Sequence, residues 1–198
     1  MQEEISGKLD GACCYLSGAI ESASDDGVGW RRRFIDLSKE ANLHIDFIDP
    51  TNKPGGIDVK IKEDKNYQID LQNNGEFLKL KEYVSEYRRY DLRFVDLSDF
   101  LVVAINPKIH ICGTYDEVFT AERQHKPIFF ICEGGLKKLP RWLFGVVDVE
   151  DKDNGIRGNV FETIEQVIDE LVQFDTGKIH MNDEWVLIRK HLEKVRSK

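Results

Sequence analysis

Apolar and polar residues follow one another in short blocks along this chain, and the first blocks predict a strand, a helix and a second strand. The apolar run Gly11–Leu16, ended by Ser17-Gly18, is typical of a buried strand. The segment His44–Ile48, closed by Asp49-Pro50, is typical of a second. Between them, apolar residues at helical spacing share one face: Trp30, Phe34, Leu37 and Ala41. This order predicts a βαβ unit and therefore a parallel sheet.

Residues 51–75 interrupt this rhythm. Turn-forming residues stand at both ends, in Lys53–Gly56 and in Asn73–Gly75. Between them Ile57, Val59 and Ile61 alternate with charged residues, which favours a short strand or one arm of a hairpin. We therefore interpret 51–75 as an insertion, and a long insertion at the C-terminal end of a strand is often a lid or a binding loop.

The rest of the chain continues the alternation. Apolar spacing predicts helices over 77–95 and 114–125, and apolar runs predict strands over 100–105, 127–132 and 145–149. Asn159 with Glu162 is a capping signal for a further amphipathic helix, whose apolar face would begin at Phe161. A final helix is predicted from Asp183.

Five parallel strands separated by helices predict a doubly wound α/β fold. The arrangement is flavodoxin-like, and Rossmann-like in its layers, with helices on both faces of the sheet. We expect residues 1–198 to form one domain, with the insertion at about 51–75 and a C-terminal helical extension at about 176–198.

Composition narrows the class of protein. With 41% hydrophobic and 32% charged residues among 198, the chain resembles a soluble globular domain. No apolar run approaches the roughly 20 residues that cross a bilayer, and Met1–Ile5 lacks the pattern of a signal peptide. We expect a cytoplasmic protein without a membrane partner. The net charge of −8 argues against a nucleic acid polymer as partner, since that would require a basic face.

Cysteines and glycines give no sign of a cofactor. The four cysteines, Cys13, Cys14, Cys112 and Cys132, form no C-x-x-C pair and lack the spacing of a metal site, so we expect reduced thiols and no metal. Cys13 and Cys14 are neighbours in a predicted strand and should point to opposite faces. No G-x-G-x-x-G follows the first strand, which disfavours a dinucleotide, and no phosphate loop supports a flavin.

The segment Gly113–Glu117 is the strongest candidate for chemistry. It lies between a predicted strand and a predicted helix, where ligands bind in such sheets, and the field of a helix N-terminus favours an ionised carboxylate. Glu117 is therefore a candidate nucleophile. Thr114 and Glu117 also fit a capping box, in which Glu117 would only bind backbone amides, and the local sequence by itself favours that reading.

Other polar residues would reach the same edge of the sheet. Tyr15 and Ser17 end the first strand, which neighbours the third in the flavodoxin-like order, so both could share a pocket with Glu117. Simpler readings are a core aromatic for Tyr15, a tight turn for Ser17, and a turn or cap for Asp99 before its strand. Asp91 lies at the edge of a helical apolar face or in a functional position.

Three segments carry a recognisable pattern in chain order: Tyr15–Ile20, Asp91–Ala104 and Gly113–Glu117, the last followed by Ala121 and Lys126-Pro127. They resemble, in turn, the opening strand and turn, the acidic helix end before an apolar strand, and the glycine turn with the catalytic glutamate and Lys-Pro of the nucleoside 2-deoxyribosyltransferase family. The relatives of that family include nucleotide N-glycoside hydrolases. The resemblance covers residues 12–132.

This resemblance implies glycosyl transfer with two carboxylates. Glu117 would attack the anomeric carbon of a ribosyl or 2-deoxyribosyl group, expel the base and form a covalent glycosyl-enzyme. Asp91 would handle the proton on the leaving base or orient the sugar, and Tyr15 would hydrogen-bond Glu117. The substrate would be a small nucleoside or nucleotide, and the expected substrate-binding positions are Ser17, Gly18, Ala19, Ile20, Asp99, Asn106, Gly113 and Thr114.

Ser17 bears on the choice of substrate. Relatives that take monophosphates hold the 5′-phosphate with hydroxyl and backbone donors after the first strand, and Ser17, Gly18 and Ala19 resemble such a segment. This favours a nucleotide slightly over a free nucleoside. Arg31 or Arg32 could contribute, although a solvated helix face is the simpler reading of these arginines.

Several alternatives stay open. Transfer to a second base would define a transferase, and transfer to water a hydrolase. A non-catalytic nucleotide-binding or sensing module with the same fold is the alternative function. Asp116 directly precedes Glu117 and competes with it for the role of nucleophile, and like charges so close would raise one pKa. Because such relatives usually form oligomers, we expect a homodimer or a higher homo-oligomer.

Overall fold

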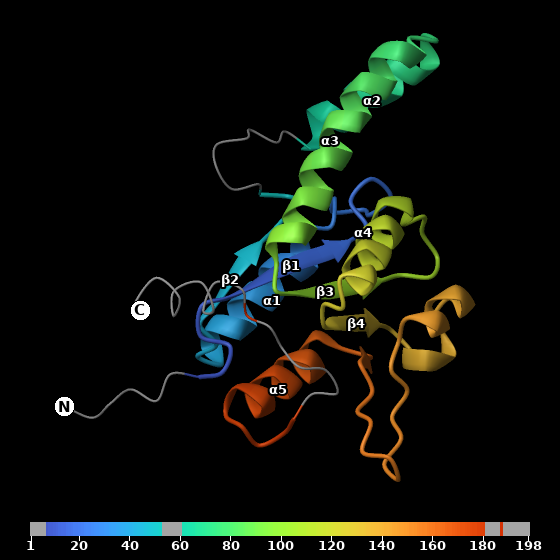
Figure 1. Ribbon diagram of the computed structural model, residues 1–198. Helices are drawn as coiled ribbons and strands as arrows, with labels where there is room; N and C mark the ends of the chain where they lie inside the picture. The colour runs from blue at the N-terminus through green and yellow to red at the C-terminus, as the bar shows by residue number, and fades with distance from the viewer. Residues whose placement is uncertain (1–6, 53–60, 181–186, 188–198) are drawn as a thin grey trace, which may run out of the picture.

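A five-stranded parallel sheet forms the centre of the computed structural model, which describes residues 7–52, 61–180 and 187 (Figure 1). The strand order is β2-β1-β3-β4-β5. The strands are β1 (Ala12–Gly18), β2 (Ile45–Ile48), β3 (Phe100–Ile105), β4 (Ile128–Cys132) and β5 (Val160–Phe161). This order is that of the doubly wound, flavodoxin-like fold, so the predicted fold class is confirmed.

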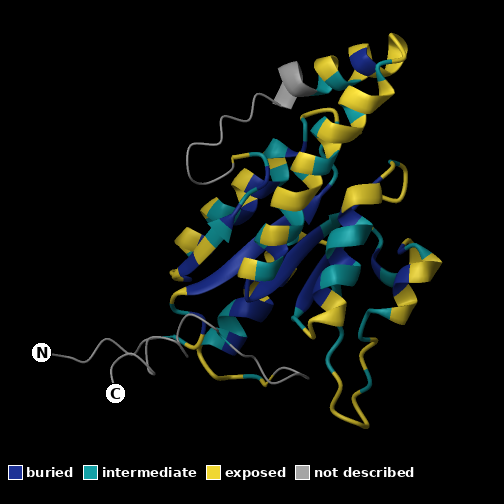
Figure 2. Cartoon of the chain, turned by 45° about the horizontal axis from the view of Figure 1, so that its top comes forward, coloured by how far each residue is buried: buried dark blue, intermediate teal, exposed yellow. Residues whose placement is uncertain are grey.

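The helices cover both faces of the sheet (Figure 2). They are α1 (Val28–Glu40), α2 (Ile61–Asn73), α3 (Phe77–Leu97), α4 (Cys112–Arg123) and α5 (Ile164–Asp175). One core cluster joins the sheet to α3 and α4 through Val95 and Val118, and another joins it to α1 and α5 through Phe34 and Leu171. Cys13 belongs to the first cluster and Cys14 to the second, so the two thiols point to opposite faces, as predicted.

The insertion contains a helix where the sequence suggested an extended arm. Helix α2 begins at Ile61, and Ile57 and Val59 lie outside the described residues. With the first part of α3 it projects away from the sheet (Figure 1), and the rings of Tyr67 and Tyr83 pack edge to face with centroids 5.2 Å apart. Lys65 of α2 also pairs with Asp26 in the loop after β1. The insertion therefore borders the carboxyl end of the first strand.

The predicted fifth strand is in the wrong place. Residues 145–149 do not form a strand, and the short 3₁₀ helix η2 (Arg141–Gly145) ends where the strand should begin. The fifth strand is instead Val160–Phe161, paired with Phe130 and Ile131 of β4. A strand of two residues has no periodicity of its own and depends entirely on its neighbour.

The helix after β5 starts later than the sequence predicted. Its N-cap is Thr163, in a capping box with Gln166, so the Asn159–Glu162 signal was wrong. Asn159 instead bridges segments: its amide donates to the carbonyl oxygen of Ile128, and its side-chain oxygen accepts from the backbone N–H of Asp148. The helix predicted from Asp183 lies outside the described residues.

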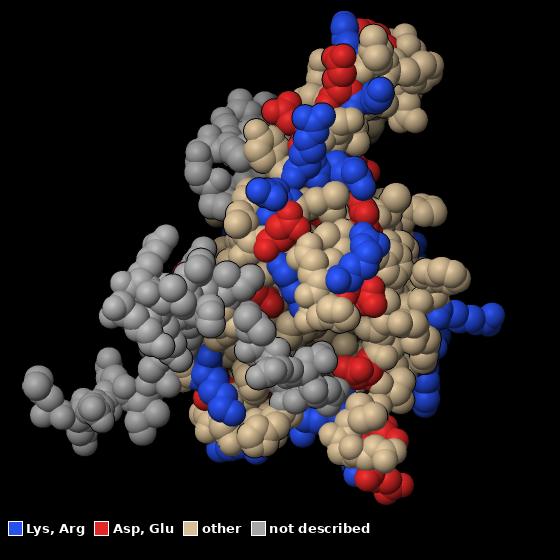
Figure 3. Space-filling model, viewed as in Figure 1, with Lys and Arg blue, Asp and Glu red and all other residues tan. Residues whose placement is uncertain are grey.

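The described residues show a mixed-charge surface (Figure 3) and no membrane-spanning helix. On the face shown in Figure 3, acidic and basic side chains are interspersed. Within residues 7–52 and 61–180, none of the helices combines the length and the apolar character needed to span a membrane.

Candidate functional site

The predicted site residues from three elements meet at the carboxyl end of β1. Because side chains alternate along a strand, Tyr15 and Ser17 both face the α3–α4 layer. Ser17 pairs with Val103 near the end of β3, and the chain then turns into α4, which carries Glu117. Tyr15 and Ser17 are fully buried, whereas Glu117 is partly buried.

Glu117 is held by both of its carboxylate oxygens. The hydroxyl of Tyr15 donates to Oε1 over 2.7 Å, and the hydroxyl of Ser17 donates to Oε2. The N-cap of α4 is Ile111, and no side chain caps the helix there. The capping-box reading of Thr114 and Glu117 is therefore wrong, since Glu117 points to the end of β1 and not to the amides of its own helix.

Burial sets the protonation of Glu117. It raises the pKa of this carboxyl to about 7, and the charge of Asp91 acts in the same direction. Hydrogen bonds from Ser17 and Tyr15 and the charge of Arg31 oppose the rise. The sequence suggested a glutamate kept ionised by the helix field. The structure instead gives a carboxyl that exchanges its proton near neutral pH.

Tyr15 remains a hydrogen-bond donor across the physiological range. Burial raises the pKa of its phenol well above the ordinary value, and the negative charges of Glu117 and Asp91 raise it further. Asp91 comes from α3 and is partly buried. Its negative charge raises the pKa values of both Tyr15 and Glu117, so Asp91 acts on this pair electrostatically.

Asp116 does not compete with Glu117 for the same position. Its carboxylate accepts from Arg88 of α3, with Nε 2.9 Å and Nη2 2.7 Å from Oδ2, and Arg88 is exposed. The negative charge that raises the pKa of Glu117 is that of Asp91. Of the two adjacent acids, Glu117 is the one that faces the strand ends.

Asp99 and Asn106, two of the predicted substrate-binding residues, accept hydrogen bonds from backbone amides instead. Asp99 precedes β3, at the opposite end of the sheet, where its Oδ2 accepts from the amide of Cys13 over 2.8 Å. Asn106 follows β3 at the correct edge, but its Oδ1 accepts from the amide of Lys108 over 3.0 Å. The simpler reading of Asp99, that it organises the entry to its strand, fits this geometry.

The remaining predicted positions surround the cluster. Gly18 ends β1, and a Cβ there would approach Trp30 to 3.0 Å and the carbonyl oxygen of Ala104 to 3.3 Å, so a larger residue would make these neighbours shift. Ala19 and Ile20 follow it and are partly buried. Gly113 and Thr114 lie in the first turn of α4, so Gly113 is not the turn glycine that the sequence suggested. Thr114 is buried, and a Cβ at Gly113 would meet nothing within 4 Å.

Two cations, Arg31 and Lys126, hold backbone segments that lead to this site. Arg31, expected on a solvated helix face, is fully buried and donates to backbone carbonyls at the end of β1. Its position three residues before Phe34 was the available signal. Lys126 donates to the carbonyls of Val95, Asp96 and Ser98 over 2.5–2.8 Å and so fixes the end of α3, the helix that carries Asp91.

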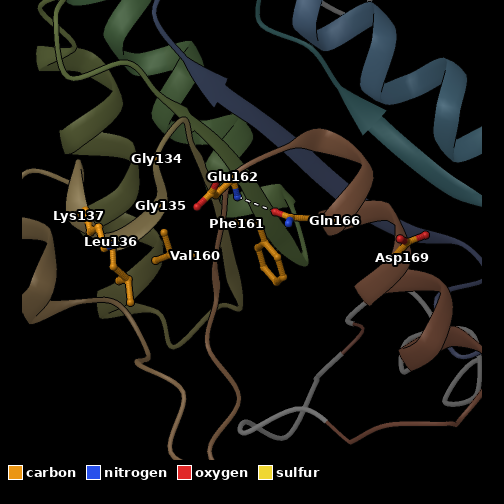
Figure 4. A pocket seen from close by; sticks show the side chains of 9 residues that line it. All are labelled: Gly134, Gly135, Leu136, Lys137, Val160, Phe161, Glu162, Gln166 and Asp169. Atoms are coloured by element: carbon orange, nitrogen blue, oxygen red, sulfur yellow. Dashed lines mark hydrogen bonds between the residues drawn. The ribbon is translucent and has the colours of Figure 1, made fainter.

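A separate pocket of about 570 Å³ opens at the carboxyl ends of β4 and β5 (Figure 4). It is lined by Gly134, Gly135, Leu136, Lys137, Val160, Phe161, Glu162, Gln166 and Asp169. Gln166 is already engaged there, because its side-chain oxygen accepts from the amide of Glu162 over 2.7 Å. The pocket does not include Glu117, and the hydrogen-bonded acid and hydroxyls at β1 are the better basis for a chemical proposal.

A scan against models of protein families found no match, and a search of curated proteins found none either. Within the described residues, no group of three or more His, Cys, Asp and Glu side chains could hold a metal ion.

Proposed function

We propose that this protein cleaves or exchanges the N-glycosidic bond of a nucleoside, a 2-deoxynucleoside or a nucleoside monophosphate. The observation that carries the proposal is the position of Glu117, whose two oxygens accept from Tyr15 and Ser17 at the carboxyl end of β1. A carboxylate fixed in this way has one orientation, which a nucleophile requires for attack in line with the bond that breaks. The resemblance of three sequence segments to nucleoside 2-deoxyribosyltransferases supports the same conclusion.

The reaction would take place in two steps. The ionised carboxylate of Glu117 forms a bond to the anomeric carbon, while the bond from that carbon to the base nitrogen breaks and its electron pair leaves with the base. Asp91 would deliver a proton to the base or orient the sugar, and Tyr15 and Ser17 would hold Glu117 in place. Water or a second base then bonds to the same carbon, while the bond from that carbon to Glu117 breaks and its electron pair returns to the carboxylate. The proton that the water or base loses would pass to Asp91, which gave up a proton in the first step.

The pKa of Glu117 near 7 fits this sequence. At neutral pH a large fraction of the carboxyl is ionised and able to attack. A carboxylate whose conjugate acid is only moderately acidic is also a better nucleophile than one with an ordinary pKa. Burial thus makes the carboxylate of Glu117 more nucleophilic, and a large fraction of it is still ionised at neutral pH.

The decisive experiment is incubation with a panel of nucleosides and monophosphates, with and without a second free base, followed by chromatography. Release of base defines a hydrolase, and a new nucleoside defines a transferase. Glu117→Gln should abolish either product, whereas Asp116→Asn, a neighbouring acid paired with Arg88, should retain the activity. If nucleotides stabilise the protein and no base is released, the non-catalytic binding module is the correct reading.

We further propose that the protein works in the cytoplasm as a homodimer or a higher homo-oligomer. The four cysteines, Cys13, Cys14, Cys112 and Cys132, form no disulfide bonds within the described residues, which fits a reducing compartment. Phe77 and Leu78 of α3 are 65% and 69% exposed, and apolar side chains at this exposure are common at interfaces between subunits. Light scattering coupled to size-exclusion chromatography would measure the number of subunits directly.

A further inference from the structure

The first strand extends beyond its neighbour β2. Strand β2 ends at Ile48, which pairs with Tyr15, so Leu16–Gly18 continue without a partner from β2. Leu16 and Gly18 are two residues apart, and their carbonyls therefore leave the same edge of β1. Buried carbonyls at such an edge need donors from another source.

Arg31 supplies these donors. Its Nε donates to the carbonyl of Leu16 over 3.0 Å, and its Nη2 donates to that of Gly18 over 2.9 Å. Its Nη1 donates to the carbonyl of Gly27 over 2.7 Å, in the turn that begins α1. The planar guanidinium thus takes the place of the missing strand, and the fixed fork of its donors suits this role better than a lysine amine.

Ser17 lies between the two carbonyls that Arg31 holds. Its own side chain points to the opposite layer, where its hydroxyl donates to Glu117. Arg31 comes from α1 on one face of the sheet, and Glu117 comes from α4 on the other. Both side chains converge on the same few residues of β1, so a movement of Arg31 would be transmitted through the backbone of Ser17 to Glu117.

The positive charge of Arg31 opposes the negative charges of Glu117 and Asp91. Asp49 at the end of β2 has Oδ1 3.7 Å from Nε, and this oxygen also accepts from Thr51. Asp25 faces Arg31 as well, but its carboxylate accepts from the amides of Gly27 and Gly29. Arg31 lowers the pKa values of Glu117 and Tyr15, whereas Asp91 raises both.

We propose that Arg31 is a positioning residue of this site, which anchors the backbone on both sides of Ser17 and places a buried positive charge behind Glu117. The inference rests on the proposed function, because it assigns Arg31 to the orientation and charge of the attacking carboxylate. Arg31 does not touch the substrate in this arrangement, since its donors point to the backbone.

Three variants separate the two parts of this role. Arg31→Met removes the charge and the donors, Arg31→Lys keeps the charge but cannot span three carbonyls, and Arg32→Met removes an exposed neighbouring charge as the control. The titration of Glu117 is followed without substrate, by the carboxyl carbon resonance that disappears in Glu117→Gln. Base release is measured in parallel as kcat and KM.

We expect the Glu117 midpoint to move up by about one pH unit in Arg31→Met and to stay unchanged in Arg32→Met. We expect Arg31→Lys to keep a midpoint near that of the wild type but to lose roughly tenfold to a hundredfold in kcat with little change in KM. An unchanged midpoint in Arg31→Met overturns the electrostatic part, and a wild-type kcat in Arg31→Lys overturns the positioning part.

If Arg31→Met does not fold, Arg31→Gln tests the charge of Arg31, because its amide can still donate to a backbone carbonyl while the positive charge is lost. The Glu117 midpoint should then move up, and an unchanged or lower midpoint contradicts the proposal. The titration requires no turnover. A wild-type protein that releases no base from any substrate therefore refutes the proposed function, while the Glu117 midpoints still decide whether Arg31 supplies the charge.

Discussion

The hydroxyl of Tyr15 donates to Oε1 of Glu117 over 2.7 Å, although the two residues are 102 positions apart in the chain. Tyr15 lies in the middle of β1, and Glu117 lies on α4, the helix that follows β3, and β3 is the neighbour of β1 in the sheet. The flavodoxin-like strand order is therefore the physical cause of the contact. If another strand lay between β1 and β3, the side chains of Tyr15 and Glu117 would be too far apart to form this hydrogen bond.

The first prediction concerns this hydrogen bond. The pH profile of base release should have a rising limb with its midpoint near 7, because only ionised Glu117 attacks. In Tyr15→Phe the ionised form loses a donor, so the pKa of Glu117 increases and the rising limb of the pH profile moves to higher pH.

The control for this prediction is Tyr90→Phe, which removes the hydroxyl of an exposed tyrosine on α3 and should leave the profile unchanged. The measurement is kcat/KM between about pH 5 and 9. A limb at the same pH in Tyr15→Phe and the wild type would show that Tyr15 does not tune Glu117.

A second prediction links Glu117 to stability. The pKa of Glu117 is about 7 in the folded chain and near its ordinary value of 4.5 when unfolded. Between these values the folded state binds more protons, so Glu117 lowers the free energy of unfolding as pH rises from about 4.5 to 7. Glu117→Gln removes this loss of unfolding free energy, because glutamine does not titrate. The variant should gain roughly 1–3 kcal/mol relative to the wild type across that interval.

Urea unfolding of both proteins at a series of pH values measures the difference, in which the contributions of all other titrating groups cancel. Asp116→Asn serves as the matched control, since its carboxylate is at the surface beside Arg88. Parallel curves for Glu117→Gln and the wild type would contradict the raised pKa.

Elements with a clear period were predictable from the sequence. The apolar runs of β1, β3 and β4 and the helical spacing of α1 and α4 are strong local signals, and their order determines the sheet. The convergence of Tyr15, Ser17 and Glu117 then followed from the strand order. The role of Glu117 did not follow from its local sequence, because a Thr-x-x-Glu pattern fits a cap equally well.

Features that depend on tertiary contacts were missed. Val160–Phe161 forms a strand only because β4 provides a partner, and the two residues look like the start of an amphipathic helix. A solvated helix face was the simpler reading of Arg31, yet β2 ends early and leaves buried carbonyls of β1 to which Arg31 donates. The partner of Val160–Phe161 and the early end of β2 cannot be read from the sequence before the strands are paired, although the helical spacing of Arg31 and Phe34 already placed Arg31 next to an apolar face.

A third prediction concerns Asp91. Its negative charge raises the pKa of Glu117, so Asp91→Asn should move the rising limb of the pH profile to lower pH. If Asp91 also delivers the proton to the leaving base, kcat should fall at every pH, although more Glu117 is ionised. The loss should be smallest for bases that leave without protonation. A limb that does not move would show that Asp91 is too distant to act on Glu117.

The last prediction separates two glycines at the site. In Gly113→Ala the new methyl group meets nothing within 4 Å and lies inside a helix, so the variant should gain about 0.5–1 kcal/mol of stability. In Gly18→Ala the methyl group would approach Trp30 and the carbonyl of Ala104, which should cost about 1–3 kcal/mol. Thermal unfolding gives both values. If Gly113 borders the bound substrate, its alanine variant should show a higher KM despite its greater stability. A wild-type KM in Gly113→Ala would remove Gly113 from the substrate site and leave it as an ordinary position in the first turn of α4.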